Sequence, residues 1–276
     1  MAVAVRYLTK TGCYPPGNFQ TSGASYLYDE PTGLLLSTVS IQPYDSIYFE
    51  SGTAWALLSE IRLWSSLILT LLPENGSYAI IPAEKPMVFK AEDSVDSLQF
   101  IGNIQNRLSE RENSESYISG HRFVDSGYDF HHTSTQVEQT LDFYHAIDPM
   151  NKVLIRGLSC MLKAKVLSRS YHALEEAALL TYISTEAVFA LLVEKLQLKS
   201  VKELYAYIED QVPNGYHLAN YHKDCRENRN NLVHPSLKFG AYDLPNLIAD
   251  DYMETYSNLV ELYRFYILNL PIQNDC

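Results

Sequence analysis

Residues 171–196 read YHALEEAALLTYISTEAVFALLVEKL, and this stretch decides the fold of the C-terminal half of the chain. It contains no proline or glycine, and its apolar side chains recur at the spacing of a helix. These apolar positions are Leu174, Ala177, Ala178, Leu180, Ile183, Val188, Leu191 and Leu192. The stretch therefore predicts one long helix.

Further helices are predicted on both sides of this stretch. The sequence Ser200-Val201-Lys202-Glu203 has the pattern of a capping box, and Pro213-Asn214-Gly215 and Pro271 supply breaks. The additional helices are predicted at residues 151–170, 200–212, 217–233 and 246–270. Five helices with short connections favour an antiparallel bundle, which we place at residues 140–276.

The first half of the chain predicts a different class of domain, mixed α/β and rich in strands, at residues 1–135. The segments that carry this prediction are strands at 33–41, 77–81 and 86–90, a helix at 53–72 and a long polar loop at 109–135. The whole chain is therefore predicted to be α+β. We expect the N-terminal domain to sense a trigger, restrain the other half or recruit a partner.

Composition limits the function and the compartment. The chain has 276 residues and a net charge of −12, which argues against broad, unspecific binding of nucleic acid. Residues 1–139 hold 8 basic and 16 acidic residues, a charge of −8, whereas residues 140–276 hold 13 and 17, a charge of −4. If the C-terminal half binds RNA, we expect it to use a small pocket.

Several features predict a cytoplasmic protein without a membrane segment. The four cysteines are scattered and form no Cys-x-x-Cys pair, so neither a zinc knuckle nor a disulfide framework is indicated. The first six residues are too few and too polar for a signal peptide. The longest nearly apolar run, residues 63–72, is too short to cross a bilayer.

The run Arg229-Asn230-Asn231-Leu232-Val233-His234, followed by Pro235, carries the candidate chemistry. Arginine is a geometric partner for phosphate, and histidine transfers protons near neutral pH. Pro235 predicts that the helix ends at or before His234. On a regular helix Arg229 and His234 point about 140° apart, whereas Asn230 and His234 share a face. We infer that Asn230 orients His234, and that a cleft between helices of two chains gathers both pairs.

The helical context and this motif resemble the HEPN superfamily. The six residues from Arg229 to His234 fit its Arg-polar-x3-His motif, in the common Arg-Asn form, at the end of the penultimate helix. The stretch Glu175-Glu176-Ala177-Ala178-Leu179-Leu180 through Thr185-Glu186-Ala187-Val188-Phe189 resembles the second helix of the Apea-like branch. The resemblance covers roughly residues 140–270, and some members of the family are inactive binding modules.

The resemblance implies a metal-independent endoribonuclease that acts as a homodimer in phage defence or a toxin-like stress system. His234 would serve as general base or acid, Arg229 would hold the scissile phosphate, and Asn230 would fix the imidazole or touch the phosphate. The products would be a 2′,3′-cyclic phosphate and a 5′-hydroxyl. RNA is the expected substrate, no cofactor is expected, and an antitoxin or a trigger protein is a possible partner.

Other residues near the motif are weaker candidates for binding substrate. Arg226 precedes Arg229 by three and offers a second phosphate contact or a surface ion pair, and Asn231 is a further candidate contact. Glu186 lies within an apolar helical pattern, where it either positions Arg229 or is solvated.

The remaining histidines give weaker signals. His131 and His132, with Asp129 and His121 nearby, lack a helix-spaced His or Glu partner, so we expect no metal site. His217 and His222 are expected at the surface, and nothing indicates that Cys225 is a nucleophile.

Two alternatives to the nuclease stay open. In the first alternative, the same helical domain is a non-catalytic HEPN-type module that binds a nucleotide or a protein. The acidic N-terminal half also fits an antitoxin-like or scaffold protein.

Overall fold

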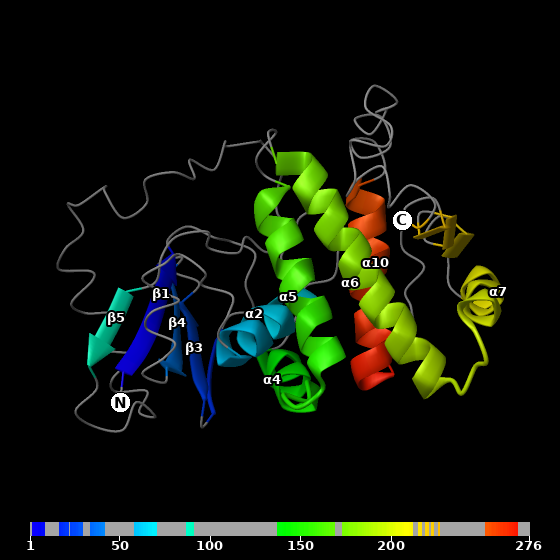
Figure 1. Cartoon of the computed structure of the whole chain (residues 1–276). Helices are drawn as coiled ribbons and strands as arrows, with labels where there is room; N and C mark the ends of the chain where they lie inside the picture. The colour runs from blue at the N-terminus through cyan, green and yellow to red at the C-terminus, as the bar shows by residue number, and fades with distance from the viewer. Residues whose placement is uncertain are drawn as a thin grey trace. The chain divides into compact units, whose positions relative to one another are not determined.

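The computed structural model describes residues 2–8, 17–21, 23–29, 34–41, 58–70, 87–90, 137–168, 173–211, 215–216, 219–220, 222–223, 226 and 252–269. The chain divides into two compact units, one of Met1–Leu72 with Ser77–Tyr144 and one of Pro73–Gly76 with His145–Cys276. The first unit contains a sheet with helices, and the described elements of the second are helical (Figure 1). The chain is therefore α+β, as the sequence predicts.

The first unit is built on a five-stranded sheet in which every neighbouring pair is antiparallel. Its spatial order is β2 (Gly17–Gln20), β3 (Ala24–Asp29), β4 (Leu34–Ile41), β1 (Ala2–Leu8) and β5 (Met87–Lys90). Antiparallel strands can be joined by short turns, so neighbours in the chain can become neighbours in the sheet. The strands β2, β3 and β4 follow one another in the chain and are neighbours in the sheet.

A hydrogen-bonded turn joins β2 to β3. The Thr21 hydroxyl oxygen accepts hydrogen bonds from the backbone N–H groups of Gly23, at 3.3 Å, and Ala24, at 3.0 Å. Threonine favours such turns because its hydroxyl replaces a backbone acceptor. The turn sets the strand register, which places Phe19 opposite Tyr26 with their rings stacked at 5.3 Å.

Two helices accompany the sheet in this unit, α2 (Leu58–Thr70) and α4 (Val137–Ala146). The α2 helix packs against β3 and β4, and most of its residues are buried. The Arg62 guanidinium donates a 2.6 Å hydrogen bond to the Tyr144 carbonyl and lies 4.2 Å from the centre of the Tyr144 ring. The Thr140 hydroxyl donates to the Thr70 hydroxyl at 3.0 Å, so α2 and α4 contact each other through polar groups at two levels.

Part of this unit is predicted by the sequence and part is not. The predicted strands 33–41 and 86–90 and the predicted helix 53–72 are confirmed as β4, β5 and α2. The strands β1, β2 and β3 are missed by the sequence analysis. The β2 strand has only four residues and directly follows Pro15-Pro16, a pattern typical of a turn. The predicted strand 77–81 and loop 109–135 lie outside the described residues.

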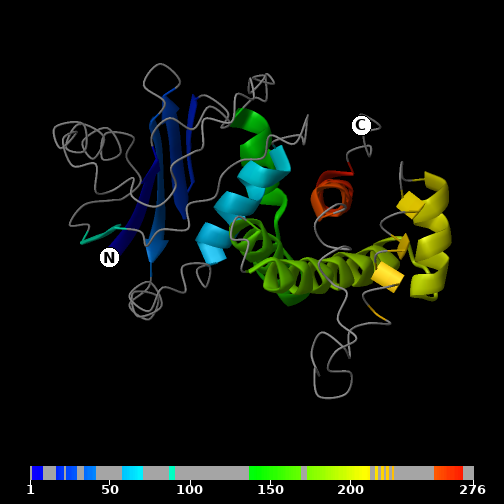
Figure 2. The ribbon, with the colours of Figure 1, turned by 90° about the horizontal axis from the view of Figure 1, so that it is seen from above.

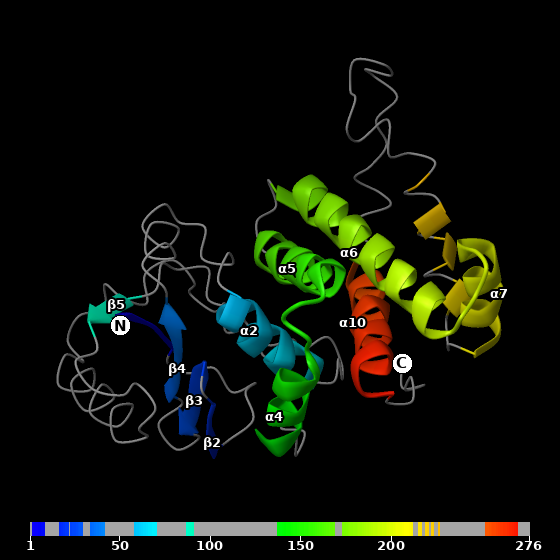
Figure 3. The ribbon, with the colours of Figure 1, turned by 60° about the horizontal axis from the view of Figure 1, so that its bottom comes forward.

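Helices α5 (Lys152–Leu167), α6 (Leu174–Lys195), α7 (Val201–Gln211) and α10 (Tyr252–Leu268) form the second unit. The α6 helix contacts the other three, and α5 and α6 lie side by side (Figure 3). Seen from above, α6 passes beside α10 and its C-terminal end leads toward α7 (Figure 2). These four helices confirm the helices predicted at 151–170, 171–196, 200–212 and 246–270.

The predicted start of α7 is confirmed with one difference. The Ser200 hydroxyl accepts from the Glu203 N–H at 3.4 Å, as in a capping box. The Glu203 carboxylate turns back to the Lys199 N–H at 2.9 Å, one residue earlier than in the usual box.

The segment that follows α7 is helical at every residue that the structure describes, namely 215, 216, 219, 220, 222, 223 and 226. The sequence analysis assigned Gly215 to the break before this helix, which is wrong. A Cβ atom at residue 215 would collide with the Ile208 carbonyl of α7, so only glycine permits this close approach. The predicted end of the helix at His234 lies outside the described residues.

The longest helix is apolar enough to be compared with a membrane span. Within the described part of the chain, one helical stretch, Glu176–Lys195, has the length and hydropathy of a span. Of its most apolar window, 56% is buried inside the protein, as in the core helix of a folded domain. The sequence analysis judged the run at 63–72 to be the longest and overlooked this stretch.

Three helices meet at Gly157. Its carbonyl accepts a 2.8 Å hydrogen bond from the Ser184 hydroxyl, and the Tyr263 hydroxyl donates to the Ser184 carbonyl at 3.0 Å. A Cβ atom at residue 157 would collide with the Tyr263 hydroxyl and lie 2.8 Å from the Ala187 Cβ. Burial raises the pKa of Tyr263, so the hydroxyl stays protonated and keeps its donor.

We expect Gly157→Ala to lower the free energy of unfolding by about 1–3 kcal/mol, because the added methyl overpacks this junction. Tyr263→Phe removes the oxygen that the methyl meets. The double variant should therefore lose less stability than the sum of the two single variants, as measured by urea unfolding. Strictly additive losses would contradict the collision that defines this junction.

Candidate functional site

The structure describes two of the six residues that the sequence nominates for the site. Glu186 lies on α6 and is partly exposed, and Arg226 lies on the helical segment after α7 and is exposed. Arg229, Asn230, Asn231 and His234 lie outside the described residues, as do the histidines considered for a metal site. Glu186 and Arg226 are both charged groups that act on the buried side chain of His222.

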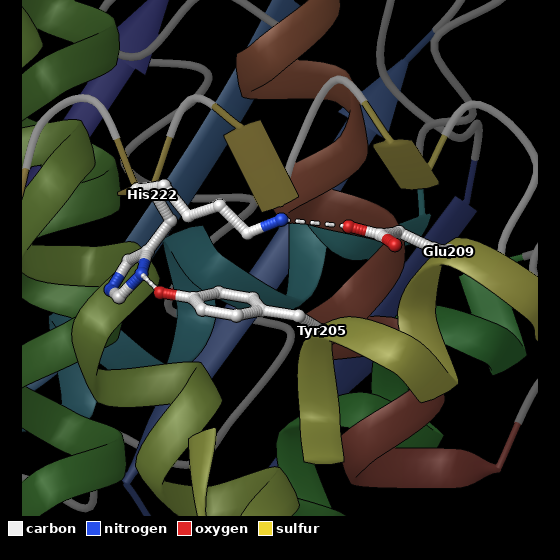
Figure 4. Close-up of polar contacts among 4 residues, drawn as sticks. Tyr205, Glu209 and His222 are labelled. Carbon is white, nitrogen blue, oxygen red and sulfur yellow. Dashed lines mark hydrogen bonds and ion pairs between the residues drawn. The ribbon is translucent and has the colours of Figure 1, made fainter. Parts of the chain in front are cut away.

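His222 is buried between α6 and α7. Its side chain is 3% exposed, and its Nδ1 lies 2.7 Å from the Tyr205 hydroxyl (Figure 4). The imidazole centre is 4.5 Å from the Phe189 ring and 5.5 Å from the Tyr182 ring. We call these four residues the His222 cluster. The expectation that His222 lies at the surface is wrong.

The residues on the buried face of the segment 215–226 explain why His222 is not at the surface. Gly215, Ala219 and His222 are all buried and follow one another at steps of four and three, which is the spacing of one helical face. Gly215 lets the segment approach Ile208 of α7 closely, and Ala219 adds a second small residue to the same face. This pattern of small residues ahead of His222 was the available signal that the face is buried.

The His222 imidazole is neutral at neutral pH. Burial lowers its pKa from 6.5 to about 4, the Glu186 carboxylate opposes this change, and the Arg226 guanidinium adds to it. The hydrogen bonds also indicate a neutral imidazole. A protonated ring needs two acceptors, and Nε2 is buried and has no hydrogen-bond partner in the described part of the chain.

Tyr205 connects the buried imidazole to charges at the surface. Burial raises the pKa of the Tyr205 phenol, and a hydrogen bond with Arg226 partly offsets this. The Lys223 ammonium lies 4.8 Å from the centre of the same ring and 2.8 Å from a Glu209 oxygen. Figure 4 shows the Tyr205 hydroxyl directed at His222. Tyr205 thus fixes both the ring of His222 and the side of the segment that carries Arg226.

Glu186 occupies the α6 side of this cluster. Its carboxylate accepts a 2.5 Å hydrogen bond from the Tyr182 hydroxyl, one turn earlier on the same helix. Because it also affects the pKa of His222, it lies within electrostatic range of the imidazole. Tyr182 therefore holds the carboxylate within electrostatic range of His222, and the predicted role of Glu186 in positioning Arg229 stays a prediction.

The chemistry available to the described residues is positioning and phosphate binding. A neutral, buried imidazole is a poor base for a substrate in solvent, so His222 acts on its neighbours. The exposed Arg226 guanidinium suits a phosphate oxygen. Among the described residues, no three His, Cys, Asp or Glu side chains are grouped so that they could hold a metal ion.

Comparison with known proteins identifies no family for this chain. A scan against protein-family models gives no match, and searches of curated proteins and of solved structures give none either.

His222 should make the stability of the protein depend on pH. The unfolded chain takes up a proton near pH 6.5 and the folded chain only near pH 4, so stability falls as the pH decreases between these values. The difference amounts to about 3 kcal/mol. His222→Gln should lose this component, so that its stability relative to the wild type rises as the pH falls. Parallel stability curves from urea unfolding between neutral and acid pH would refute the buried, neutral imidazole.

Tyr205 and Tyr207 offer a matched pair of substitutions on α7. Tyr205→Phe removes the partner of the His222 Nδ1, and we expect a loss of about 1–3 kcal/mol. Tyr207 is partly exposed, and Tyr207→Phe should change the free energy of unfolding by less than about 0.5 kcal/mol. Equal effects of the two substitutions would show that the Tyr205–His222 hydrogen bond contributes nothing.

Proposed function

We propose that the protein is a metal-independent endoribonuclease of the HEPN type that acts in the cytoplasm, in phage defence or a toxin-like stress system. The observation that carries the proposal is the anchoring of the segment 215–226 by His222. This anchoring leaves Arg226 exposed, one helical turn before Arg229 in the sequence. The helical character of the described elements of the second unit is consistent with it.

The reaction needs a base, an acid and a cation at one phosphate. The base takes the proton of a ribose 2′-hydroxyl, and the 2′-oxygen attacks the phosphorus. The bond to the 5′-oxygen breaks, and the acid donates a proton to that oxygen. The products are a 2′,3′-cyclic phosphate and a 5′-hydroxyl. Arg229 would stabilise the charge that grows on the phosphate oxygens, with Asn230 and Asn231 beside it.

A homodimer satisfies the proton balance. One His234 imidazole cannot accept the proton of the 2′-hydroxyl and donate to the leaving oxygen in the same step. Two copies supply one unprotonated and one protonated imidazole, which are the base and the acid. Residues 1–135 would then sense a trigger protein or bind an antitoxin, in line with their charge.

A non-catalytic module that binds a nucleotide is the second candidate. Tyr216 is 61% exposed and lies on the same segment as Arg226. An exposed ring for stacking and a guanidinium for phosphate are the two kinds of group that such a binding surface uses.

The direct test is cleavage of a labelled RNA in the presence of EDTA. We expect His234→Ala to lower the rate about 10²–10⁴-fold and Arg229→Ala about 10²–10³-fold, since each removes a group that acts on the reacting phosphate. Mass spectrometry of the fragments should show cyclic phosphate ends.

His145→Ala and Arg156→Ala are the matched controls, because both residues are exposed and lie on α4 and α5. They should cleave at the wild-type rate. Full activity in His234→Ala would refute the assignment. RNA binding without turnover in the wild type would favour the binding module.

A further inference from the structure

The α5 helix is basic, although the chain as a whole is acidic. The chain has a net charge of −12, whereas α5 contains neither Asp nor Glu. Its basic residues are Lys152, Arg156, Lys163 and Lys165. Lys165 is buried and lies 5.4 Å from the centre of the Tyr256 ring. The other three make no hydrogen bond or ion pair with any residue that the structure describes.

Lys152, Arg156 and Lys163 form a row along one side of α5, which we call the α5 row. At about 100° per residue they lie within about 40° of each other, on the side opposite to the buried Leu154. Lys152 and Arg156 are exposed, and Lys163 is partly exposed. Burial raises the pKa of the Cys160 thiol, and Arg156 and Lys163 oppose this rise, so both cations lie within electrostatic range of one side chain.

The α5 row does not stabilise the helix that carries it. Lys152 is the first residue of α5, where the helix dipole disfavours a cation, and the first turn contains no acidic residue. Lys152 and Arg156 are four residues apart, a spacing at which like charges repel each other. Asp148 precedes them, but its carboxylate accepts the Met150 N–H at 2.8 Å. Such local conflicts are typical of functional positions, so the row indicates a binding role.

Two exposed apolar side chains accompany the N-terminal end of the row. Met150 is 81% exposed and Val153 is 45% exposed, and both are close to Lys152 in the sequence. Methionine and arginine are enriched in protein–protein interfaces. We call the α5 row together with Met150 and Val153 the α5 surface. It offers cations and an apolar contact side by side.

We propose that the α5 surface binds a short, extended, acidic segment of a partner protein. Carboxylates of the segment would pair with the α5 row, and an apolar side chain of the segment would contact Met150 and Val153. The row is about 16 Å long, which matches a segment better than a folded domain that buries about 800 Å². Alternate side chains of an extended chain are about 6.6 Å apart, close to the rise of about 6 Å between Lys152 and Arg156.

The same observations favour a peptide over other anionic partners. Surfaces for single-stranded RNA combine cations with aromatic rings, whereas the large exposed side chains beside this row are Met150 and Val153. A helix that lies in a membrane surface has apolar residues along its length, and here they are at one end. The net charge of −12 repels a long polyanion, whereas a short segment interacts mainly with the row, because distant charges are screened by salt.

The α5 surface is distinct from the candidate RNA site, so the inference does not depend on the proposed nuclease. Gly157 of α5 accepts a hydrogen bond from Ser184 of α6, whereas His222 packs on Phe189 of the same helix. Ser184 and Phe189 point about 140° apart. Figure 3 shows α6 between α5 and α7. A partner on α5 therefore leaves the segment 215–226 accessible to RNA.

Fluorescence anisotropy with the full chain tests the inference. The probe is a labelled peptide in which glutamate and leucine alternate, and the control peptide has glutamine in place of glutamate. We expect the wild type to bind the probe at least about tenfold more tightly than the control, and less tightly at high salt. Arg156→Glu should weaken binding at least about tenfold, because like charges then face each other. Lys202→Glu makes the same change at an exposed position of α7 and should leave the affinity unchanged.

Arg156→Glu also replaces a repulsive pair with Lys152 by an attractive one, so α5 should keep its stability and a loss of binding reports on the surface. The inference is overturned if the wild type binds neither peptide or both equally, or if Arg156→Glu binds the probe like the wild type. Displacement of the probe by a single-stranded RNA overturns it in favour of nucleic acid. Binding to phosphatidylglycerol vesicles in place of the probe assigns the surface to a membrane and overturns it as well.

Discussion

The fold of the second unit depends on burial of the apolar surface of α6. Its 22 residues are apolar around most of the helix, and such a helix is stable in water only when other elements pack against it. Helices α5, α7 and α10 each contact it, and Gly157 lets α5 come close enough for Tyr263 and Ser184 to bond beneath it. The segment 215–226 covers a further part through His222. The position of His222 in the candidate site follows from this packing.

His222 shows how the covering of α6 shapes the candidate site. The imidazole is buried against Phe189 and held by the Tyr205 hydroxyl, so it is neutral and fixed in orientation. That hydrogen bond couples the core to Arg226, because Tyr205 contacts both. A histidine that the sequence analysis expected at the surface therefore serves as an anchor. The catalytic role in the proposed mechanism falls to His234, which comes three helical turns later in the sequence.

The sequence predicts helices well where the apolar spacing is long, and strands poorly where they are short. The spacing in residues 171–196 and the capping pattern at Ser200 locate α6 and α7 to within a few residues. The strands β2 and β3 are too short to show alternation, and their pairing depends on the Thr21 turn. The environment of His222 could not be predicted from the sequence, because the three rings around it belong to residues 17 to 40 positions earlier in the chain. Contacts across that distance depend on packing and leave no local pattern.

The buried His222 connects these observations, since it holds the segment that carries Arg226 against α6 and α7. An NMR titration of the histidine side chains tests this account most directly, because each imidazole reports its own protonation. The account predicts that the His222 ring stays neutral through pH 6.5 and takes up a proton only near pH 4. A His222 ring that takes up its proton near pH 6.5 would contradict it.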